Sequence, residues 1–197
     1  ADGIESLDEL PDLPEQTVLV AIPYLDYTDK ELSKIKRFLD GGGTLLLMDD
    51  YGYGNTVLAY LGVGARFSNK PLLDPLFNYK NQSMPRIIDF VPEVKESGVN
   101  VIVLNHATTL TGIEPAEVTA RSSTASFLDI NEDGSWGQGE PEGPFAVAAG
   151  FRLAKGSLVL VSDPSIMINS MVDWDDNYGF IRYFTSFNGE QGGLLID

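Results

Sequence analysis

Residues 129–140 form an acidic loop whose oxygen-bearing side chains have the spacing of a calcium site. Set against the twelve-residue EF-hand loop, side-chain oxygens stand at positions one, three, five and twelve, and a glycine stands at position six, where the chain must turn sharply. Position seven contributes a backbone carbonyl, and a water molecule fills position nine. The predicted calcium ligands are Asp129, Asn131, Asp133, the carbonyl of Ser135, and both carboxylate oxygens of Glu140.

The residues that flank this loop, 126–128 and 143–145, have the character of strands. We therefore expect a β-hairpin that carries a calcium loop without the helix pair of an EF-hand, with the ion fixing the tip of the hairpin. The alternative is a solvated acidic turn in which Asp129 and Asp133 accept hydrogen bonds from nearby backbone N–H groups. A calcium loop of ordinary affinity fills where calcium is near millimolar, which predicts an extracytoplasmic location.

A second candidate site comes from polar and aromatic residues that follow the predicted strands. In an open α/β sheet, ligands bind beyond the carboxyl ends of the strands, and the loops 23–27, 49–55, 105–108 and 162–165 occupy that position. The alternative is that these residues cap helices and satisfy the loop backbone. The residues of this possible ligand crevice are Tyr24, Asp26, Asp49, Asp50, Tyr51, Tyr53, Asn105, His106, Asp163 and Ser165.

His106 is the only histidine, and therefore the only histidine base available for catalysis. A Ser-His-Asp arrangement with Asp163 and Ser165 is geometrically conceivable, but the sequence around Ser165 lacks the G-x-S-x-G turn that exposes a nucleophile. Asp49 and Asp50 would suit hydrolysis of a glycosidic bond, yet adjacent residues at a strand end point apart. We therefore expect a binding function without catalytic residues, and the alternative is a hydrolase that uses His106, Asp163 and Ser165.

The elements that must position these loops begin at Thr17, after an N-terminal segment of residues 1–16 that has no lasting periodicity. Thr28 and Glu31 form a capping box that predicts the start of a helix, because each side chain accepts a hydrogen bond from the other's free N–H. Apolar residues at helical spacing follow, and the glycines 41–43 end the helix.

Four short apolar runs, residues 17–22, 44–48, 99–104 and 157–161, are continuous rather than alternating, which is typical of strands covered on both faces. We predict one α/β domain over residues 17–197: a three-layer, doubly wound, mostly parallel open sheet with helices on both faces, of the flavodoxin-like type. Further predictions are a helix capped by Asn55 and ending at Gly62, a surface excursion of about thirty-five residues, a strand pair at 118–128 and 145–151, a helix from Asp176 that buries Ile181 and Phe184, and a last strand at 194–196.

Composition limits the function classes. Asp and Glu number 29 against 13 Lys and Arg, so the formal net charge is −16 and nucleic acid is excluded as a partner. With no cysteine, the chain has no disulfides, thiol nucleophiles or cysteine-ligated metals. The apolar runs have the length of strands, so no membrane span is expected within these residues.

Four segments also carry a family resemblance: residues 38–50 (FLDGGGTLLLMDD), residues 143–149, residues 160–165 with Asn169, and the pair Asp176-Asn177. In this order they resemble the DUF4350 family, of uncharacterised function, within the class I glutamine amidotransferase-like (GATase1-like) fold. Amidotransferases of that fold use a cysteine nucleophile, which this chain lacks, so amidotransferase chemistry is excluded. The resemblance implies a domain held beside a membrane by segments outside these 197 residues.

Together these observations predict an extracytoplasmic, calcium-stabilised α/β domain that binds a small ligand or a protein partner, with membrane attachment supplied from outside this sequence. A purely structural adaptor at the membrane is a third alternative. An extended exposed apolar patch would be its sign.

Overall fold

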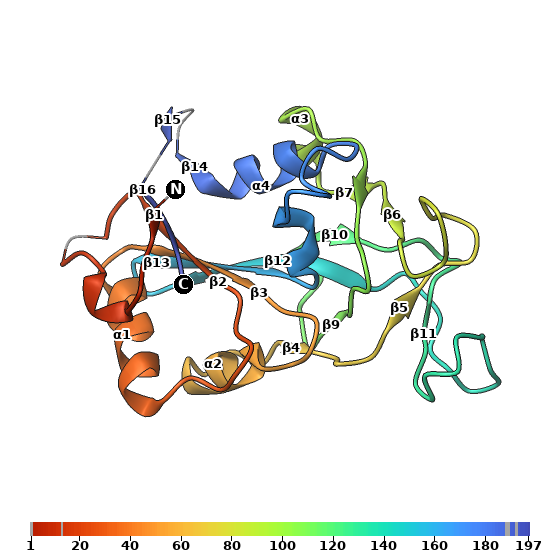
Figure 1. Ribbon diagram of the computed structural model, residues 1–197, viewed down its shortest axis with the longest axis horizontal. Helices are drawn as coiled ribbons and strands as arrows, with labels where there is room; N and C mark the ends of the chain where they lie inside the picture. The colour runs from red at the N-terminus through yellow and green to blue at the C-terminus, as the bar shows by residue number, and fades with distance from the viewer. Residues whose placement is uncertain (1, 13, 188–189, 192) are drawn as a thin grey trace.

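A central mixed sheet organises the fold (Figure 1). The computed structural model describes residues 2–12, 14–187, 190–191 and 193–197. Along the sheet the strands follow the order β1 (Asp2–Gly3), β16 (Gly193–Ile196), β2 (Thr17–Ala21), β3 (Thr44–Met48), β13 (Gly156–Val161), β12 (Ala146–Leu153), β10 (Val118–Arg121) and β7 (Asp89–Phe90), while β9 (Leu110–Thr111) joins at β12 and β4 (Arg66–Phe67) pairs with β9.

The strands from β1 to β13 are parallel, and those from β13 to β7 are antiparallel. The sequence-based strands at 17–22, 44–48 and 157–161 therefore do lie side by side in one parallel group. The last predicted strand, at 194–196, also joins this group beside β2. Continuous apolar sequence correctly indicated strands covered on both faces.

The fourth strand of that prediction is not in the central sheet, so the four-strand doubly wound arrangement is wrong. Within residues 99–104, only β8 (Ile102–Val103) is a strand, and it pairs with β6 (Arg86–Ile87) in a separate two-stranded sheet. Its backbone is satisfied instead by a helix: the Asn177 amide accepts from the Val103 N–H at 2.9 Å and donates to the Val103 carbonyl at 3.0 Å. Residues 99–104 are therefore apolar because they are buried beneath the helix that begins at Asn177, and not because they belong to the central sheet.

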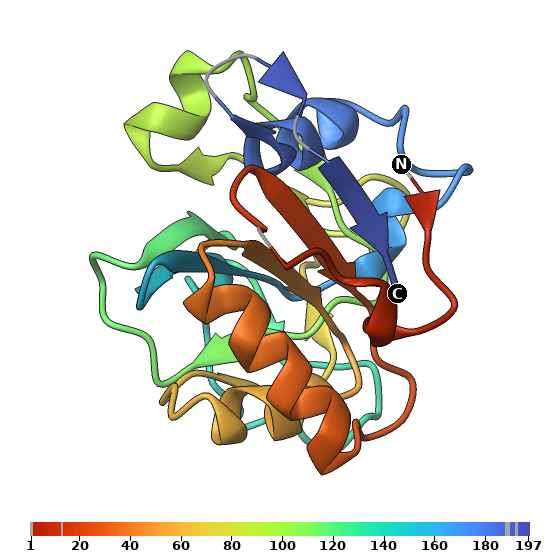
Figure 2. The same cartoon turned by 90° about the vertical axis from the view of Figure 1, so that its left-hand side faces the viewer.

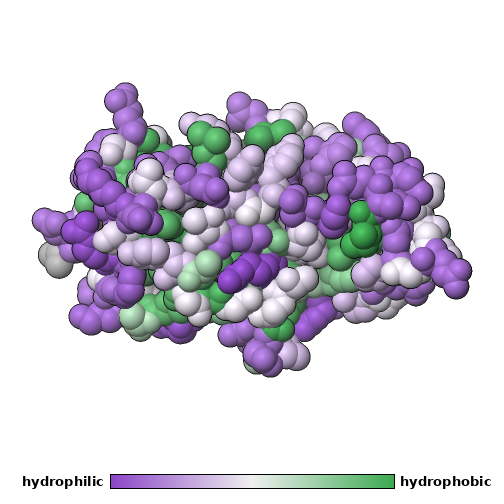
Figure 3. Space-filling model, turned by 90° about the horizontal axis from the view of Figure 1, so that it is seen from below, coloured by the Kyte–Doolittle hydropathy of each residue, from purple (hydrophilic) through white to green (hydrophobic). Residues whose placement is uncertain are grey.

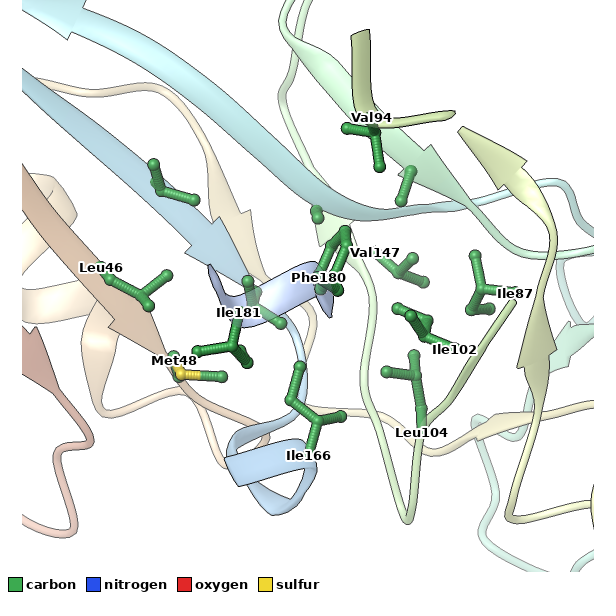
Figure 4. Packing of buried hydrophobic residues seen from close by; sticks show 14 of the residues in the cluster. Leu46, Met48, Ile87, Val94, Ile102, Leu104, Val147, Ile166, Phe180 and Ile181 are labelled. Atoms are coloured by element: carbon green, nitrogen blue, oxygen red, sulfur yellow. The ribbon is translucent and has the colours of Figure 1, made fainter. Parts of the chain in front are cut away.

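Helices cover both faces of the sheet and make three layers (Figure 2). On one face lie α1 (Asp29–Asp40) and α2 (Gly54–Tyr60), and on the other lie α4 (Asn177–Thr185), α3 (Pro92–Glu96) and the 3₁₀ helix η2 (Pro164–Met167). Alternate residues of β3 serve the two cores, with Leu45 and Leu47 packing toward α1, and Leu46 and Met48 toward α4. Phe180 of α4 packs in the core between α4 and the sheet, together with Leu46 and Met48 (Figure 4).

The capping box at the start of α1 is confirmed. The Thr28 N–H donates to Glu31 Oε2 at 2.7 Å, and the Glu31 N–H donates to Thr28 Oγ1 at 3.4 Å. The predicted cap at Asn55 is wrong, because its side chain instead bonds the N–H and carbonyl of Phe67 at 2.8 and 3.0 Å. Gly62, with a φ of +72°, does end the segment after α2.

The predicted strand pair is only partly as expected. β10 and β12 are antiparallel, but residues 127–128 form a separate strand, β11 (Phe127–Leu128), which pairs with β5 (Leu72–Leu73). The predicted final helix begins at Asn177, directly after Asp176. The remaining elements are the 3₁₀ helix η1 (Leu7–Glu9) and the pair β14 (Ser186–Phe187) and β15 (Glu190–Gln191).

The face covered by α1 and α2 is mostly hydrophilic, with apolar side chains in separate small groups (Figure 3). Within the described ranges, no helix is long and apolar enough to cross a bilayer.

Candidate functional site

Three of the four predicted loops meet at the carboxyl ends of β2, β3 and β13. They line a cavity of about 470 Å³, which we call the strand-end crevice. The fourth loop, residues 105–108, lines an adjoining cavity of about 280 Å³ that shares Asp50 and Tyr51 with the crevice. The strand-end crevice is lined by Ile22, Pro23, Tyr24, Met48, Asp49, Asp50, Tyr51, Tyr53, Pro164 and Ser165.

Asp49 is a buried carboxylate that shapes the turn before α2. Only 2% of it is exposed, and it accepts the N–H groups of Tyr51 at 2.8 Å, Gly52 at 3.0 Å and Gly54 at 2.6 Å. Burial raises the pKa of Asp49, while these N–H donors favour its ionised form. Its lone pairs are therefore engaged in holding the loop that presents Asp50 and Tyr51.

Asp163 plays the same role at the neighbouring strand end. It is fully buried, with Oδ2 accepting the Asn105 N–H at 2.6 Å and Oδ1 accepting the Ser165 N–H at 2.7 Å. Burial raises the pKa of Asp163 to about 7, and the two backbone donors oppose this rise. The carboxyl group thereby ties the 105–108 loop to the start of η2.

Asp50 differs from both neighbours because it is only half-buried. Within the described part of the chain, its carboxylate accepts no hydrogen bond from another residue's side chain or backbone. Burial raises the pKa of Asp50, and the charge of Asp49 raises it further, whereas a hydrogen bond from its own backbone N–H and the neighbouring His106 lower it. Asp50 is thus an acceptor available to a ligand where the two cavities meet.

His106 lies in the exposed tip of its loop, with a left-handed backbone φ of +56°. Its N–H donates to the Ser83 carbonyl at 2.8 Å, and its ring Nδ1 is 2.9 Å from Asn105 Oδ1. Among the described residues, no hydrogen bond joins His106 to Asp163 or Ser165. A serine hydrolase requires a nucleophile, a base and an orienting acid that are linked by hydrogen bonds. The described residues do not show this linkage for Ser165, His106 and Asp163.

Tyrosine side chains supply the open walls of the strand-end crevice. Tyr24 is 80% exposed, Tyr51 is 70% exposed and Tyr53 is 38% exposed. Asp26, by contrast, does not line the crevice, since its Oδ1 accepts the Thr56 hydroxyl at 2.6 Å. The crevice therefore presents aromatic rings and the Asp50 carboxylate, which in the described ranges accepts no hydrogen bond from another residue.

The acidic loop 129–140 folds its side chains onto its own backbone. Buried Asp129 accepts the N–H groups of Asp133 at 3.1 Å and Gly134 at 2.8 Å. Glu140 accepts those of Ile130 at 2.7 Å and Gly137 at 2.8 Å.

The other two predicted side-chain ligands, Asn131 and Asp133, also bond within this loop. The Asp133 N–H donates to Asn131 Oδ1 at 3.1 Å, and the Ser135 N–H donates to Asp133 Oδ1 at 2.8 Å. In the ranges that the structure describes, no three histidine, cysteine, aspartate or glutamate side chains gather closely enough to hold a metal ion.

Sequence reasoning missed a link between the two candidate sites. Lys70 Nζ lies 2.8 Å from Glu132 Oε1, and both residues line the cavity that adjoins the strand-end crevice. In addition, the Asp129 N–H donates to the Pro71 carbonyl at 3.0 Å. These contacts join residues about sixty positions apart, so no local spacing could have revealed them.

Comparisons with solved structures place this fold among known proteins. The N-terminal domain of mmIFT52 is similar with a TM-score of 0.69 and 16% identity, over 93% of this chain and 82% of that one. A β-galactosidase from Bacillus circulans sp. alkalophilus is similar with a TM-score of 0.52 and 16% identity, over 89% of this chain and 23% of that one. At these identities the likeness concerns the fold alone.

Proteins of curated function give no match to this sequence. The model of the family described as "Domain of unknown function (DUF4350)" matches residues 1–185, which is nearly the whole chain. The chain therefore belongs to the DUF4350 family.

Proposed function

We propose that this chain is a non-catalytic binding domain that takes a small ligand or a protein partner in the strand-end crevice. One observation supports this most strongly: the buried carboxylates Asp49 and Asp163 are engaged with backbone N–H groups, while in the described ranges the side chains of Asp50 and the exposed tyrosines bond to no other residue. Rigid, partly apolar walls with a few polar groups are typical of ligand sites. A general base, in contrast, must reach the proton that it removes.

A fragment screen by ¹⁵N NMR tests the proposal. We expect the bound fragments to shift the amide signals of residues lining the strand-end crevice, and Tyr51→Ala to weaken their binding. Tyr60→Ala is the matched control, because Tyr60 is 43% exposed and lies at the end of α2, outside the crevice lining. Fragments that cluster elsewhere, or that bind Tyr51→Ala unchanged, would refute the crevice as the binding site.

The hydrolase alternative makes a different prediction for His106→Ala. If the domain only binds, this variant remains folded and loses no ligand affinity. A measured ester, amide or glycoside hydrolysis that disappears in His106→Ala would favour the hydrolase.

We also propose that calcium stabilises the 129–140 loop through Asp129, Asn131, Asp133, the Ser135 carbonyl and Glu140. The oxygen spacing supports this, as does Gly134 at position six, whose φ of +76° gives the sharp turn. Binding would require Asp129 and Glu140 to exchange loop N–H donors for the ion. The ion would then hold the loop beside the Lys70–Glu132 pair.

Calorimetric titration with calcium tests this part. We expect binding that Glu140→Gln weakens by about tenfold or more, whereas Glu132→Gln, in the same loop but outside the ligand set, retains it. Absence of heat at millimolar calcium, or binding unchanged by Asp129→Ala combined with Asp133→Ala, would remove calcium from the proposal.

An extracytoplasmic, membrane-attached location follows as a proposal from the calcium loop, because such loops fill where calcium is near millimolar. Fractionation of cells expressing the full-length gene product tests the location, and recovery as a freely dissolved cytoplasmic protein would contradict it.

We likewise propose a relation to the flavodoxin-like and GATase1-like folds, supported by the parallel strands between two layers of helices.

A further inference from the structure

We propose that the strand-end crevice binds an organic cation, an ammonium or guanidinium group, carried either by a free small molecule or by a basic side chain of a peptide. This inference rests on the proposed binding function and names its ligand chemistry. Three features of the crevice support it: its charges, its walls and the state of its backbone donors.

The charged groups around the crevice are mainly acidic. Asp49 and Asp50 line the crevice from the loop after β3. Asp163, at the start of η2, lies behind the crevice and is fully buried. On the far side, Lys70 is paired with Glu132 and does not offset them. His106, in the adjoining cavity, is the neighbour that lowers the pKa of Asp50.

In the whole chain the formal net charge is −16, so the surrounding field also attracts cations. Asp50 is the one of these three aspartates whose carboxylate is not already bonded to backbone N–H groups of other residues. A ligand cation would therefore find an acceptor there.

The walls suit a cation as well. Tyr24, from the loop after β2, and Tyr51 and Tyr53, from the loop after β3, line one cavity of about 470 Å³. Aromatic rings attract ammonium and guanidinium groups through their negative faces, and the attraction grows when the cation is desolvated. Three exposed tyrosines beside a carboxylate offer both kinds of interaction at once.

The backbone N–H groups of the crevice loops disfavour an anionic ligand, because they are already bonded. The N–H groups of Tyr51, Gly52 and Gly54 all donate to Asp49, and those of Asn105 and Ser165 donate to Asp163. An anion therefore finds these five donors engaged. Buried carboxylates have already taken the donors that loops at strand ends commonly offer to phosphates and carboxylates.

A pair of isosteres tests the charge requirement directly. Choline and 3,3-dimethylbutan-1-ol have nearly the same shape, but only choline is charged. In ¹⁵N NMR titrations we expect choline to shift crevice signals and to bind at least about fivefold more tightly than the alcohol. We expect Asp50→Asn to weaken choline by a similar factor. Asp40→Asn, which removes the same charge from the remote end of α1, should leave the affinity unchanged.

The source of the cation is distinguished by two further probes, N-acetyl-lysine methylamide and N-acetyl-arginine methylamide. Tighter binding of either than of choline would identify a basic side chain of a peptide, and the reverse order would identify a free ammonium compound. Equal binding of choline and its neutral isostere at crevice residues would overturn the cation inference and leave the binding function standing. No shift with any cationic probe would also overturn it, and the unbiased fragment screen would then decide the binding function separately.

Discussion

Replacing Asp49 by asparagine tests whether its carboxylate holds the turn before α2. The carboxylate accepts three backbone N–H groups, two at Oδ1 from Tyr51 and Gly52 and one at Oδ2 from Gly54. Asparagine keeps one oxygen and replaces the other with an NH₂ group, which cannot accept. In either orientation of the amide, at least one buried N–H therefore faces another donor.

The expected loss follows from these contacts. A buried donor left without its acceptor costs about 1–3 kcal/mol, and the remaining bonds weaken because they are no longer charge-assisted. Relief of the buried charge offsets part of this, since burial disfavours the ionised form of Asp49. We expect the free energy of unfolding to fall by about 2 kcal/mol, which corresponds to a decrease of roughly 4–8 °C in Tm for a domain of this size.

The neighbouring residue supplies the control. Asp50→Asn removes the same charge one position along the chain, but the Asp50 side chain holds no backbone group of another residue. Its unfolding free energy should stay within about 0.5 kcal/mol of the unmodified protein. Urea unfolding followed by circular dichroism at pH 8 measures both variants. If Asp49→Asn is no less stable than Asp50→Asn, the role assigned to the three hydrogen bonds is wrong.

Three further predictions concern stability. The pKa of Asp163 is about 7 in the folded protein against 3.8 for an ordinary aspartate, so the folded state holds a proton that the unfolded state releases. The stability that this proton contributes is present below pH 4 and is lost as the pH rises toward 7. The free energy of unfolding measured from pH 4 to pH 8 should show this decline, and Asp163→Asn should flatten it. Gly112→Ala should destabilise the protein by more than about 1 kcal/mol, because its φ is +67° and a Cβ would lie 2.6 Å from the Gly64 carbonyl oxygen. Gly98→Ala, with a φ of +98° and open space around it, should lose only the smaller free energy of placing alanine at a positive φ. Equal losses in urea unfolding would contradict this. Thr28→Ala should cost about 1 kcal/mol by removal of the α1 cap, and a Tm unchanged by this substitution would show that Glu31 alone suffices.

The features that the sequence predicted correctly are mainly local or topological. The capping box at Thr28 and Glu31 depends on residues three positions apart, and it formed as expected. The strand-end loops met because parallel strands bring their carboxyl ends to one edge. The cap assigned to Asn55 failed because that side chain had a better partner in Phe67, twelve residues away.

Residues 99–104 show the limit of reasoning from hydrophobicity. A buried apolar run does not say whether its backbone is bonded to a strand or to side chains. Here Asn177, more than seventy residues later, bonds Val103, and this contact has no local signal. The Lys70–Glu132 pair was invisible for the same reason.

The pairing of Asn177 with Val103 has a consequence for the order of assembly. The N–H groups of Asn100 and Val101 donate to Asp176 Oδ2 at 2.8 and 3.1 Å. Together with the bond from Val103 to Asn177, the start of α4 and the residue before it accept three backbone N–H groups of this segment. During synthesis on the ribosome, these backbone groups stay bonded to water until residues 176 and 177 have emerged. In the finished protein, the amide hydrogen of Val103 can exchange with solvent only when α4 detaches, so its exchange rate measures how often the last helix opens.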